Sequence, residues 1–397
     1  MRRRALASAM TSGMNEGGGP VAEISGMCEE RFSGVWDALA ANLDGGLDVG
    51  ASVAVFVDGV PVVDIWGGHT DENGEVPWQR DTITNCWSLT KTMAALCTLI
   101  LADRGELEFS APVARYWPEF AAAGKSEIEV RHLLGHTAGL SGWTEPMTAE
   151  DLYDWEKATS LLGAQEPWWT PGTQSGYHAL TQGYLIGEVV RRITGSTLGS
   201  FFAAEVTGPL GADFHIGLPP EEDARVAFVI PPDLPSLLDV APLADTIAGR
   251  TLLNPPMTGA EPWVDGWRRA EIPAANGHGN ARSVAQIQSV VACGGELSGT
   301  RLLSSKGCEA IFDEQANGVD HVLGPGFRLG VGYGLSSDVV PIGPRACFWG
   351  GWGGSIVVID LDARLTVSYV MNRMASSLLG DTRGADILFA AAVGAAG

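Results

Sequence analysis

Lysine and charged residues are scarce in this chain. Only four of the 397 residues are lysine, and charged residues make up 18% of the chain against 45% hydrophobic residues. This composition is typical of a globular protein with a large core, and it excludes a disordered one. The formal net charge of −22 argues against nucleic acid or an anionic membrane as a partner.

Long apolar runs and paired cysteines are missing as well. The apolar runs 93–102 and 387–396 are shorter than the roughly 20 residues that span a bilayer, so no membrane partner is expected. Residues 1–25 contain three arginines but no apolar stretch of a signal peptide, and we interpret them as a disordered tail on a cytoplasmic protein. The six cysteines show no C-x-x-C pair and no metal-ligand spacing, so we expect free thiols, no metal and no cofactor.

Apolar patterns near both ends of the chain predict one antiparallel sheet made of distant segments. Residues 52–68 are two apolar runs around Asp58-Gly59, a pair typical of a hairpin turn, and residues 355–374 repeat this pattern. A helix is predicted over 381–393, with Asp381 as its N-cap.

The region between these ends is predicted to be mainly helical. Leu180, Tyr184 and Val189 recur near helical spacing, for example. The predicted helices cover 128–136, 150–162, 177–195 and 198–211, and the proline-rich segment 215–238 predicts loops.

One of the four lysines stands three residues after a serine. Ser88 and Lys91 share a face if this segment is helical, with their Cβ atoms about 5–6 Å apart. Thr84 or Asn85 is expected to cap that helix, which places Ser88 in the first turn with a free backbone N–H. Burial lowers the pKa of a lysine, so Lys91 is a candidate base for Ser88. The pattern S-x-x-K alone is short, and a serine beside a snorkelling lysine also produces it.

Two further segments carry candidate chemistry. Tyr177 follows a Pro-Gly turn in 171-PGTQSGYHAL-180, and a phenol is a usable acid or base when its pKa is tuned. The glycine-rich segment 347-CFWGGWGGSIVV-358 predicts a strand edge where the backbone approaches a ligand and offers an N–H to an oxyanion.

Three segments resemble, in their order along the chain, the motifs of serine β-lactamase-like hydrolases. They are Ser88-Leu89-Thr90-Lys91, Tyr177 and Trp349-Gly350-Gly351. The branch they resemble most is that of the class C β-lactamase-related (family VIII) carboxylesterases. The resemblance covers roughly residues 30–395, and it includes 64-DIWGG-68, 131-RHLLGHTAGL-140, 274-AANGHGNAR-282 and 326-GFRLGVGYGL-335.

The resemblance implies an α+β fold of the β-lactamase/penicillin-binding-protein type. Such a fold has an antiparallel sheet flanked by helices, with an inserted, mainly α-helical domain. We expect the α/β domain to comprise residues 26–105 and 275–397, and the inserted domain to comprise residues 106–274.

The resemblance also implies the roles of the site residues. Ser88 is the expected nucleophile, and Lys91 and Tyr177 are expected to move its proton. The backbone N–H groups of Ser88 and Trp352 are the expected oxyanion hole. The residues expected to contact the substrate are Trp349, Gly350, Gly351, Trp169 and His178.

Two departures from the β-lactamase pattern bear on the substrate. Tyr177-His178-Ala179 lacks the asparagine of Y-x-N, and Trp349 stands where β-lactamases have the lysine of K-T-G. Without that amide and that cation, we expect neutral, apolar acyl groups of short to medium length and little or no β-lactam hydrolysis.

The expected function is therefore hydrolysis of small carboxylic esters through an acyl-enzyme on Ser88. An acyltransferase, or an enzyme that forms or hydrolyses amides, uses the same intermediate and remains an alternative, as does a non-catalytic penicillin-binding-like module. His132 and His136 form H-x-x-x-H, but Leu133 stands where a zinc protease has glutamate, so packing is the preferred interpretation. The glycine-rich loop Asn276-Gly277-His278-Gly279 has no phosphate-binding pattern; the resemblance implies a place near the active site, and structural scaffolding is an equal alternative.

Overall fold

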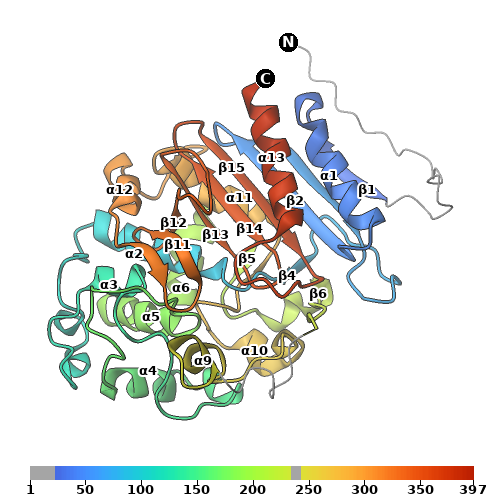
Figure 1. Cartoon of the computed structure of the whole chain (residues 1–397). Coiled ribbons are helices and arrows are strands. Elements are labelled where there is room, and N and C mark those ends of the chain that lie inside the picture. Colours follow the sequence, from blue (N-terminus) through green and yellow to red (C-terminus); the bar gives the residue numbers. More distant parts are fainter. Residues whose placement is uncertain (1–22, 234–242) are drawn as a thin grey trace.

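The computed structural model describes residues 23–233 and 243–397. In these residues, nine strands form one antiparallel sheet that joins the first part of the chain to the last (Figure 1). In spatial order the strands are β1 (Ile24–Cys28), β3 (Val60–Gly68), β2 (Gly50–Val57), β15 (Leu365–Met371), β14 (Ile356–Asp360), β13 (Ala346–Gly350), β12 (Gly334–Leu335), β11 (Gly324–Leu329) and β10 (Ala316–Asp320).

Both predicted hairpins are confirmed. Asp58 and Gly59 connect β2 to β3 with φ angles of 50° and 72°, and two left-handed residues in a row suit a tight hairpin between twisted strands. Strands β14 and β15 pair in the same antiparallel way. The pairing of β15 with β2, from Leu365 opposite Val57, closes the sheet across the chain.

The sheet is buried on both faces. Along β2, Val53 and Val55 point into a core formed with helices α1 (Ser33–Asp44) and α13 (Thr382–Ala396). The alternate residues Ala54 and Phe56 belong to a second core, which includes helices α2 (Thr90–Asp103) and α11 (Ala281–Ala292). Strands covered on both faces read as nearly continuous apolar runs, as β2 does. Figure 1 shows α1 and α13 together on one face of the sheet.

The middle of the chain is mainly helical, as predicted. Its α-helices are α3 (Val130–Leu134), α4 (Trp155–Ala164), α5 (Thr181–Thr194), α6 (Leu198–Phe202), α7 (Gly208–Leu210), α9 (Ile247–Leu252) and α10 (Asp265–Arg269), and α12 (Ser305–Glu309) follows later. The 3-10 helices are Glu30–Phe32, Val113–Arg115, Pro118–Ala121, Glu150–Tyr153, Pro220–Arg225, Glu261–Trp263 and Ala310–Phe312, and a π-helical turn covers Ala203–Thr207.

Two predicted helices begin later than expected. Helix α5 begins at Thr181, so Tyr177 lies in the loop that precedes it. The predicted helix 150–162 is interrupted at Asp154, whose side chain caps α4 by accepting the Lys157 N–H at 2.9 Å. The predicted loop 215–238 is only partly irregular where it is described, because it includes the 3-10 helix Pro220–Arg225 and a short strand, β6 (Val226–Ala227).

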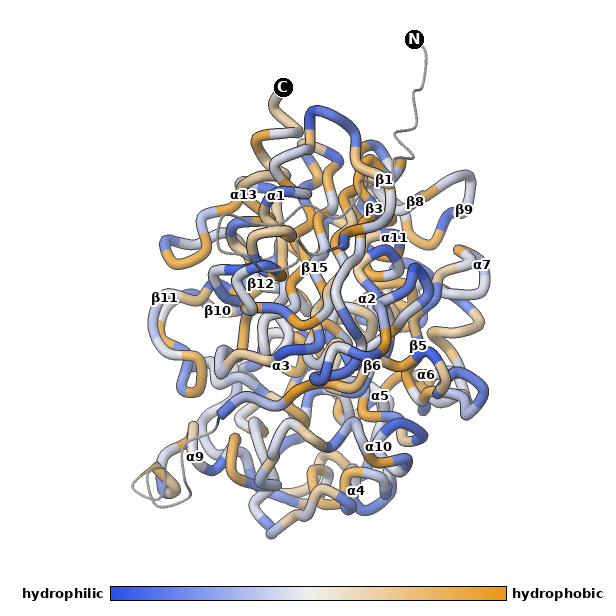
Figure 2. The backbone as a smooth tube through the Cα atoms, turned by 90° about the vertical axis from the view of Figure 1, so that its right-hand side faces the viewer, coloured by the Kyte–Doolittle hydropathy of each residue, from blue (hydrophilic) through white to orange (hydrophobic). Residues whose placement is uncertain are grey.

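A small second sheet connects the helical region to the large sheet. Its order is β5 (Phe214–His215), β7 (His278–Gly279), β4 (Ile83–Asn85) and β6, while β8 (Glu296–Leu297) and β9 (Thr300–Arg301) form a separate pair. Figure 2 shows α13 and α1 at one end of the molecule and α4, α9 and α10 at the other. The division into two domains remains a prediction.

Two predictions about location are tested only in part. The predicted tail, residues 1–25, lies outside the described residues except for its last three positions, where β1 begins. No helix in residues 23–233 or 243–397 combines the length and the apolar character needed to cross a membrane. The cytoplasmic location remains a prediction.

Candidate active site

Ser88 lies in a turn between β4 and α2. Residues 86–89 form this turn, and Trp87, immediately before Ser88, has a left-handed φ of 49°. The predicted capping by Thr84 or Asn85 is wrong, because both residues belong to β4 and their side chains hydrogen-bond elsewhere. Helix α2 begins at Thr90, one turn later than expected, so Ser88 precedes the helix.

The loop around Gly277 holds the Ser88 turn. This loop therefore lies near the candidate active site, where it was expected. The Cys86 N–H donates to the Gly277 carbonyl at 2.8 Å, and the Gly277 N–H donates to Thr90 Oγ1 at 2.8 Å. Gly277 has no room for a side chain, because a Cβ there would lie 2.5 Å from the Phe214 ring and 2.6 Å from Thr90 Oγ1. The two ends of the Ser88 turn are thus fixed from one residue.

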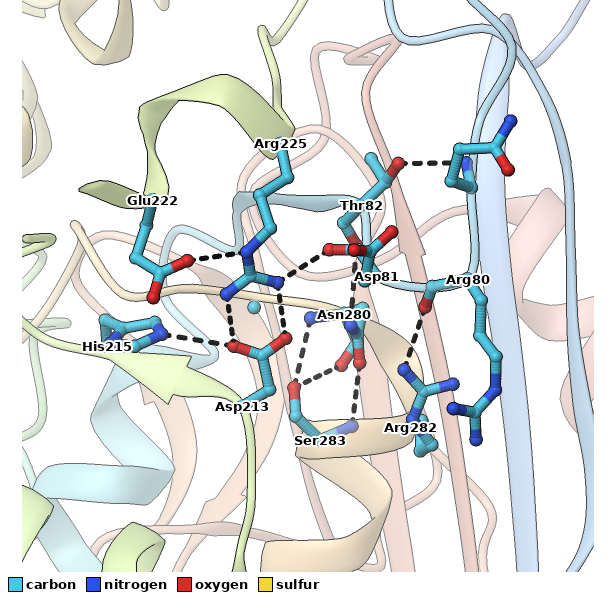
Figure 3. Close-up of polar contacts among 12 residues, drawn as sticks. Arg80, Asp81, Thr82, Asp213, His215, Glu222, Arg225, Asn280, Arg282 and Ser283 are labelled. Atoms are coloured by element: carbon cyan, nitrogen blue, oxygen red, sulfur yellow. Dashed lines mark hydrogen bonds and ion pairs between the residues drawn. The ribbon is translucent and has the colours of Figure 1, made fainter. Parts of the chain in front are cut away.

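A cluster of ion pairs supports the small sheet that leads to Ser88 (Figure 3). Arg225 donates to both Asp213 oxygens, at 2.7 and 2.8 Å, and to the Asp81 carbonyl at 2.7 Å. His215 Nε2 also lies 3.1 Å from Asp213 Oδ1. Burial acts to raise the pKa of Asp213, but these hydrogen bonds hold it well below the usual range. These contacts hold the start of strand β4 in place, and β4 leads directly into the Ser88 turn.

Lys91 is a buried amine with three polar neighbours. Its Nζ lies 3.1 Å from Ser88 Oγ, and it donates to the carbonyl oxygens of Ala179 at 2.6 Å and Ala274 at 2.9 Å. The side chain is 1% exposed, and no carboxylate in residues 23–233 or 243–397 compensates its charge. Burial therefore holds the pKa of Lys91 well below its usual value of 10.5, which favours the neutral amine.

Tyr177 approaches Ser88 from the loop before α5. Its hydroxyl donates to Ser88 Oγ at 2.6 Å, and the Lys91 Nζ lies 4.7 Å from the centre of its ring. Burial raises the pKa of the phenol above its usual value, and the carboxylate of Asp320 acts in the same direction. The hydrogen bond with Ser88 and the nearby indole of Trp349 act in the opposite direction, but burial is the largest effect. Tyr177 is therefore protonated at neutral pH.

The structure brings Ser88, Lys91 and Tyr177 together from distant parts of the sequence. Ser88 is 8% exposed, whereas Lys91 and Tyr177 are 1% and 2% exposed. Ser88 is thus the most exposed residue of the three, although all three are buried.

Trp349 lies beside Tyr177, at the end of β13. Its ring is 5.7 Å from that of Tyr177, and both pack with Leu329 in a small apolar cluster. The Trp349 ring also stacks on His136, with the ring centres 5.5 Å apart. The buried indole N–H of Trp349 faces the phenol, but it makes no hydrogen bond of normal geometry to any described residue.

The glycines after Trp349 lie close against neighbouring segments of the protein, and their contact with a substrate remains a prediction. A Cβ on Gly350 would lie 2.6 Å from the Leu379 backbone, and one on Gly351 would lie 2.5 Å from the Cys86 carbonyl. These glycines therefore admit neighbouring segments of the protein itself. The close approach brings this segment directly against the turn that carries Ser88.

The two predicted oxyanion donors are free to bind a ligand. In the described part of the chain, neither the Ser88 N–H nor the Trp352 N–H donates a hydrogen bond to another residue. The Trp352 ring packs edge-on against Trp87 at 4.9 Å, which links the two turns that carry these groups. Whether the two N–H groups form an oxyanion hole remains a prediction.

Of the two remaining predicted substrate contacts, Trp169 lies nearer to solvent than His178. Trp169 is partly exposed, and its indole N–H donates to the Gln174 carbonyl at 3.0 Å. His178 is fully buried, donates from Nδ1 to the Gly176 carbonyl at 2.6 Å and accepts the Leu140 N–H on Nε2 at 3.2 Å. Burial lowers the pKa of His178 to about 4, so the ring is neutral. This placement favours a role in holding the loop of Tyr177.

Sequence reasoning missed Asp320, which holds the catalytic loop from β10. Its buried Oδ1 accepts the N–H groups of Tyr177, Val322 and Leu323 at 2.9–3.0 Å. His136 is a second support, because its Nδ1 accepts the His178 N–H at 3.1 Å.

The predicted interpretation of His136 as a packed residue agrees with this contact. No group of three or more His, Cys, Asp or Glu side chains in the described residues is arranged to hold a metal ion.

Comparison with known families places this site in context. The beta-lactamase family matches residues 39–392. The chain belongs to the beta-lactamase family. The resemblance seen in the sequence and the fold type that it implied are confirmed for this beta-lactamase-family protein.

Several known proteins are similar to this chain over most of their length. The esterase/beta-lactamase LipL of Mycobacterium tuberculosis (strain ATCC 25618 / H37Rv) is 36% identical over 371 residues, which cover 90% of this chain and 84% of LipL. A crystal structure of a family VIII carboxylesterase has a TM-score of 0.88 and 42% identity, covering 94% of this chain and 100% of the other. A penicillin-binding protein homologue from Caulobacter crescentus has a TM-score of 0.86, 34% identity and the same coverage.

Proposed function

We propose that this protein is a serine hydrolase that cleaves carboxylic esters through an acyl-enzyme on Ser88. The observation that carries this proposal is the position of Ser88 Oγ, 3.1 Å from Lys91 Nζ and 2.6 Å from the Tyr177 hydroxyl. A serine hydroxyl is a weak nucleophile unless a neighbouring group accepts its proton, and here two titratable groups lie within reach. Related proteins named as esterases support the same reaction class.

The surroundings of the two groups support different roles for them. A neutral amine has two N–H groups and one lone pair. The carbonyls of Ala179 and Ala274 accept the two N–H groups of Lys91, which leaves the lone pair for the proton of Ser88. Tyr177 is protonated and donates to Ser88 Oγ, so it is the acid of the pair rather than the base.

The reaction then follows in two steps. Ser88 Oγ attacks the ester carbonyl as its proton moves to Lys91 Nζ, and the carbonyl oxygen becomes an oxyanion bound by the Ser88 and Trp352 N–H groups. The C–O bond to the alcohol breaks, and the alkoxide takes a proton from the Tyr177 hydroxyl, which regains one from Lys91. Water attacks the acyl-enzyme by the same proton path in reverse, which releases the acid and restores Ser88.

The groups around the site support neutral and apolar substrates. Lys91 is held neutral by burial, and burial also lowers the pKa of both His136 and His178, so none of these three groups offers a cation to a carboxylate. The apolar cluster of Tyr177 and Trp349 continues into the partly buried side chains of Val322, Leu323 and Leu379. We therefore expect short-to-medium aliphatic acyl groups and little hydrolysis of penicillins, which carry a carboxylate.

A test combines rates with direct detection of the intermediate. Hydrolysis of p-nitrophenyl esters of increasing chain length gives the acyl preference, and intact mass spectrometry of quenched reactions detects the acyl-enzyme. Ser88→Ala should lower kcat by about 10³-fold or more and abolish the mass adduct. Ser160→Ala, on the exposed side of α4, is the matched control and should leave both unchanged.

Two outcomes would contradict the proposal. Hydrolysis by Ser88→Ala at the rate of the unmodified protein would exclude Ser88 as the nucleophile. A persistent lack of any covalent adduct with a labelled fluorophosphonate would favour the binding-module alternative. Added alcohol or amine tests the acyltransferase and amide alternatives, since a new ester or amide product reveals transfer.

A further inference from the structure

The turn that carries the Trp352 N–H is closed by two backbone hydrogen bonds, from the Gly354 N–H to the Gly351 carbonyl at 3.2 Å and from the Gly351 N–H to the Ser355 carbonyl at 2.7 Å. It follows β13 and contains Gly353 and Gly354, with φ angles of 100° and 131°, which other residues rarely adopt. An oxyanion donor contributes to catalysis only when it is held in place before the reaction, because reorientation during the reaction costs free energy. Neither of these two hydrogen bonds involves Trp352 or Gly353, so contacts from outside the turn matter for how this part of its backbone is held.

The side chain of Arg383, from the first turn of α13, lies directly behind it. Its Nη2 donates to the Gly353 carbonyl at 2.5 Å. A Cβ on Gly354 would lie 2.5 Å from the same Nη2 and 2.6 Å from Asp381 Oδ2. Glycine at position 354 thus leaves the space that the guanidinium and its carboxylate partner fill. Two backbone contacts also hold Gly353, because its N–H donates to the Ser377 carbonyl at 2.9 Å and its carbonyl accepts the Ala375 N–H at 2.8 Å.

Arg383 also connects three other segments to this turn. Its Nη1 donates to the carbonyls of Leu47 at 3.1 Å and Arg373 at 2.8 Å, and to Asp48 Oδ1 at 2.8 Å. Its Nε and Nη2 contact Asp381, which is the N-cap of α13. These partners belong to the loop before β2, the loop after β15 and the start of α13. Figure 1 shows β2, β15 and α13 close together at the large sheet.

The electrostatics explain how this charge is tolerated in the interior. The Arg383 side chain is 5% exposed, and the Asp48 side chain is fully buried. A buried guanidinium is costly unless its charge is paired and its N–H groups are used, and here two carboxylates and three carbonyls satisfy it. Its planar fork fixes the direction of each donor, which a flexible lysine ammonium does not.

We infer that Arg383 is a positioning residue that holds the 352–354 turn so that the Trp352 N–H faces the oxyanion. The Trp352 ring, packed on Trp87, holds the same turn from the side of Ser88. The inference rests on the proposed function, because it assigns a purpose to the oxyanion donor. Arg383 touches no reacting atom, so its effect has to pass through the backbone.

The decisive variant is Arg383→Met, compared with Arg345→Met. Arg345 forms exposed ion pairs with Glu309 and Asp362, so its loss removes an arginine from the same domain without disturbing the turn. Removal of a whole oxyanion donor costs about 10²–10³ in kcat, so a misplaced donor should lower kcat by roughly 10- to 100-fold in Arg383→Met, with KM nearly unchanged. Arg383→Lys should recover part of this loss.

A second measurement separates positioning from a general loss of structure. A trifluoromethyl ketone that adds to Ser88 depends on the oxyanion hole, and its affinity should fall in parallel with kcat in Arg383→Met. Binding of an unreacted ester in the Ser88→Ala background does not use that hole fully and should change little. If Arg383→Met does not fold, Asp381→Asn replaces it, because Asn retains the N-cap while weakening the contact with Nη2, and kcat should fall by about 3- to 10-fold.

The outcomes distinguish the inference from the proposed function. A folded Arg383→Met protein with unchanged kcat and unchanged inhibitor affinity overturns the inference while Ser88→Ala remains inactive. Full activity of Ser88→Ala overturns the proposed function itself. An equal loss in Arg383→Met and Arg345→Met would show that a nonspecific charge effect, not the turn, is responsible.

Discussion

Lys91 and Lys125 are both buried lysines, and their surroundings are alike in three respects. Each side chain is at most 1% exposed, each amine donates to two backbone carbonyls, and each lies near an aromatic ring. The acceptors of Lys125 are the carbonyls of Ala122 at 2.9 Å and Gln165 at 2.5 Å. Burial lowers the pKa of Lys125 to about 8 and that of Lys91 well below its usual value.

The difference lies in what occupies the third position around the amine. At Lys91 it is the hydroxyl of Ser88, whereas Lys125 has no side-chain hydroxyl among its hydrogen-bond partners in the described residues. Burial and a lowered pKa therefore do not by themselves make a lysine a catalytic base. At Lys91, two fixed carbonyls leave the lone pair of the neutral amine directed at Ser88, and this is the arrangement on which the proposed function rests.

The largest effect in this comparison is expected from Lys91→Met and Lys125→Met. Both changes remove an amine and leave two buried carbonyls without a partner, so they match in structural cost. Lys91→Met should lower kcat/KM by about 10³- to 10⁴-fold because the base is lost, and Lys125→Met should stay within a few-fold of the unmodified protein. Ester hydrolysis measured for the two purified variants checks this, and equal losses would break the comparison.

The next effect concerns the two buried phenols, Tyr177 and Tyr184. Tyr177→Phe removes the proton donor at Ser88 and should lower kcat by about 10²- to 10³-fold. Tyr184 donates to the Leu152 carbonyl at 2.5 Å, away from Ser88, so Tyr184→Phe should cost only about 1 kcal/mol of stability and no activity. Steady-state kinetics and urea unfolding measure these two quantities. A Tyr177→Phe protein that keeps its full rate would assign the acid role to another group.

The pH dependence of the rate sharpens the assignment of the base. The pKa of Lys91 is lowered by burial, so kcat/KM should fall as the pH drops through that value and the amine takes up a proton. This acid limb should persist in Lys125→Met. The pKa of Tyr177 is raised, so a rate that rises only in strongly alkaline buffer would identify the phenolate as the base instead. Both profiles come from initial rates across the pH range.

The smallest effect is expected on stability, at Lys125. The pKa of Lys125 is about 8 in the folded protein, against the usual value of 10.5 that applies in the unfolded chain. The folded state therefore binds fewer protons than the unfolded state between pH 8 and 10.5. The free energy of unfolding should therefore rise with pH across this window through Lys125, and it should rise less steeply in Lys125→Met. Above pH 10.5, where Lys125 is neutral in both states, Lys125→Met should lower it by roughly 1–3 kcal/mol because two carbonyls lose their donor, and this difference should shrink as the pH falls towards 8. Urea denaturation at several pH values tests both statements.

Local patterns in the sequence were sufficient to predict the hairpins, the helix after Asp381 and the pairing of Ser88 with Lys91. These features depend on neighbours in the chain, such as the turn at Asp58 and Gly59. The predicted capping by Thr84 or Asn85 failed because the small sheet recruits these residues as a strand. Tertiary pairing here outweighs a local capping preference.

Other parts of the site had no signal in the sequence. The carbonyls that hold Lys91 belong to residues 88 and 183 positions away, and every residue has a carbonyl. Asp320 and Arg383 act through their buried positions, and nothing distinguishes them by sequence from the exposed carboxylates and arginines of the chain. Gly353 and Gly354 were noticed, but the reason for them is the space occupied by neighbouring protein segments.

The pairing of β2 with β15 has a consequence for how the protein is made. The partners Val57 and Leu365 are more than three hundred residues apart, and they lie in the middle of the large sheet. When the Ser88 turn has been synthesised, most of the chain still has to be translated. Only then can the glycine-rich segment 347–358 and Arg383 contact this part of the protein. Contacts of such long sequence separation form slowly, so hydrolytic activity should appear only after translation is nearly finished, and the growing chain passes most of its synthesis without a working site.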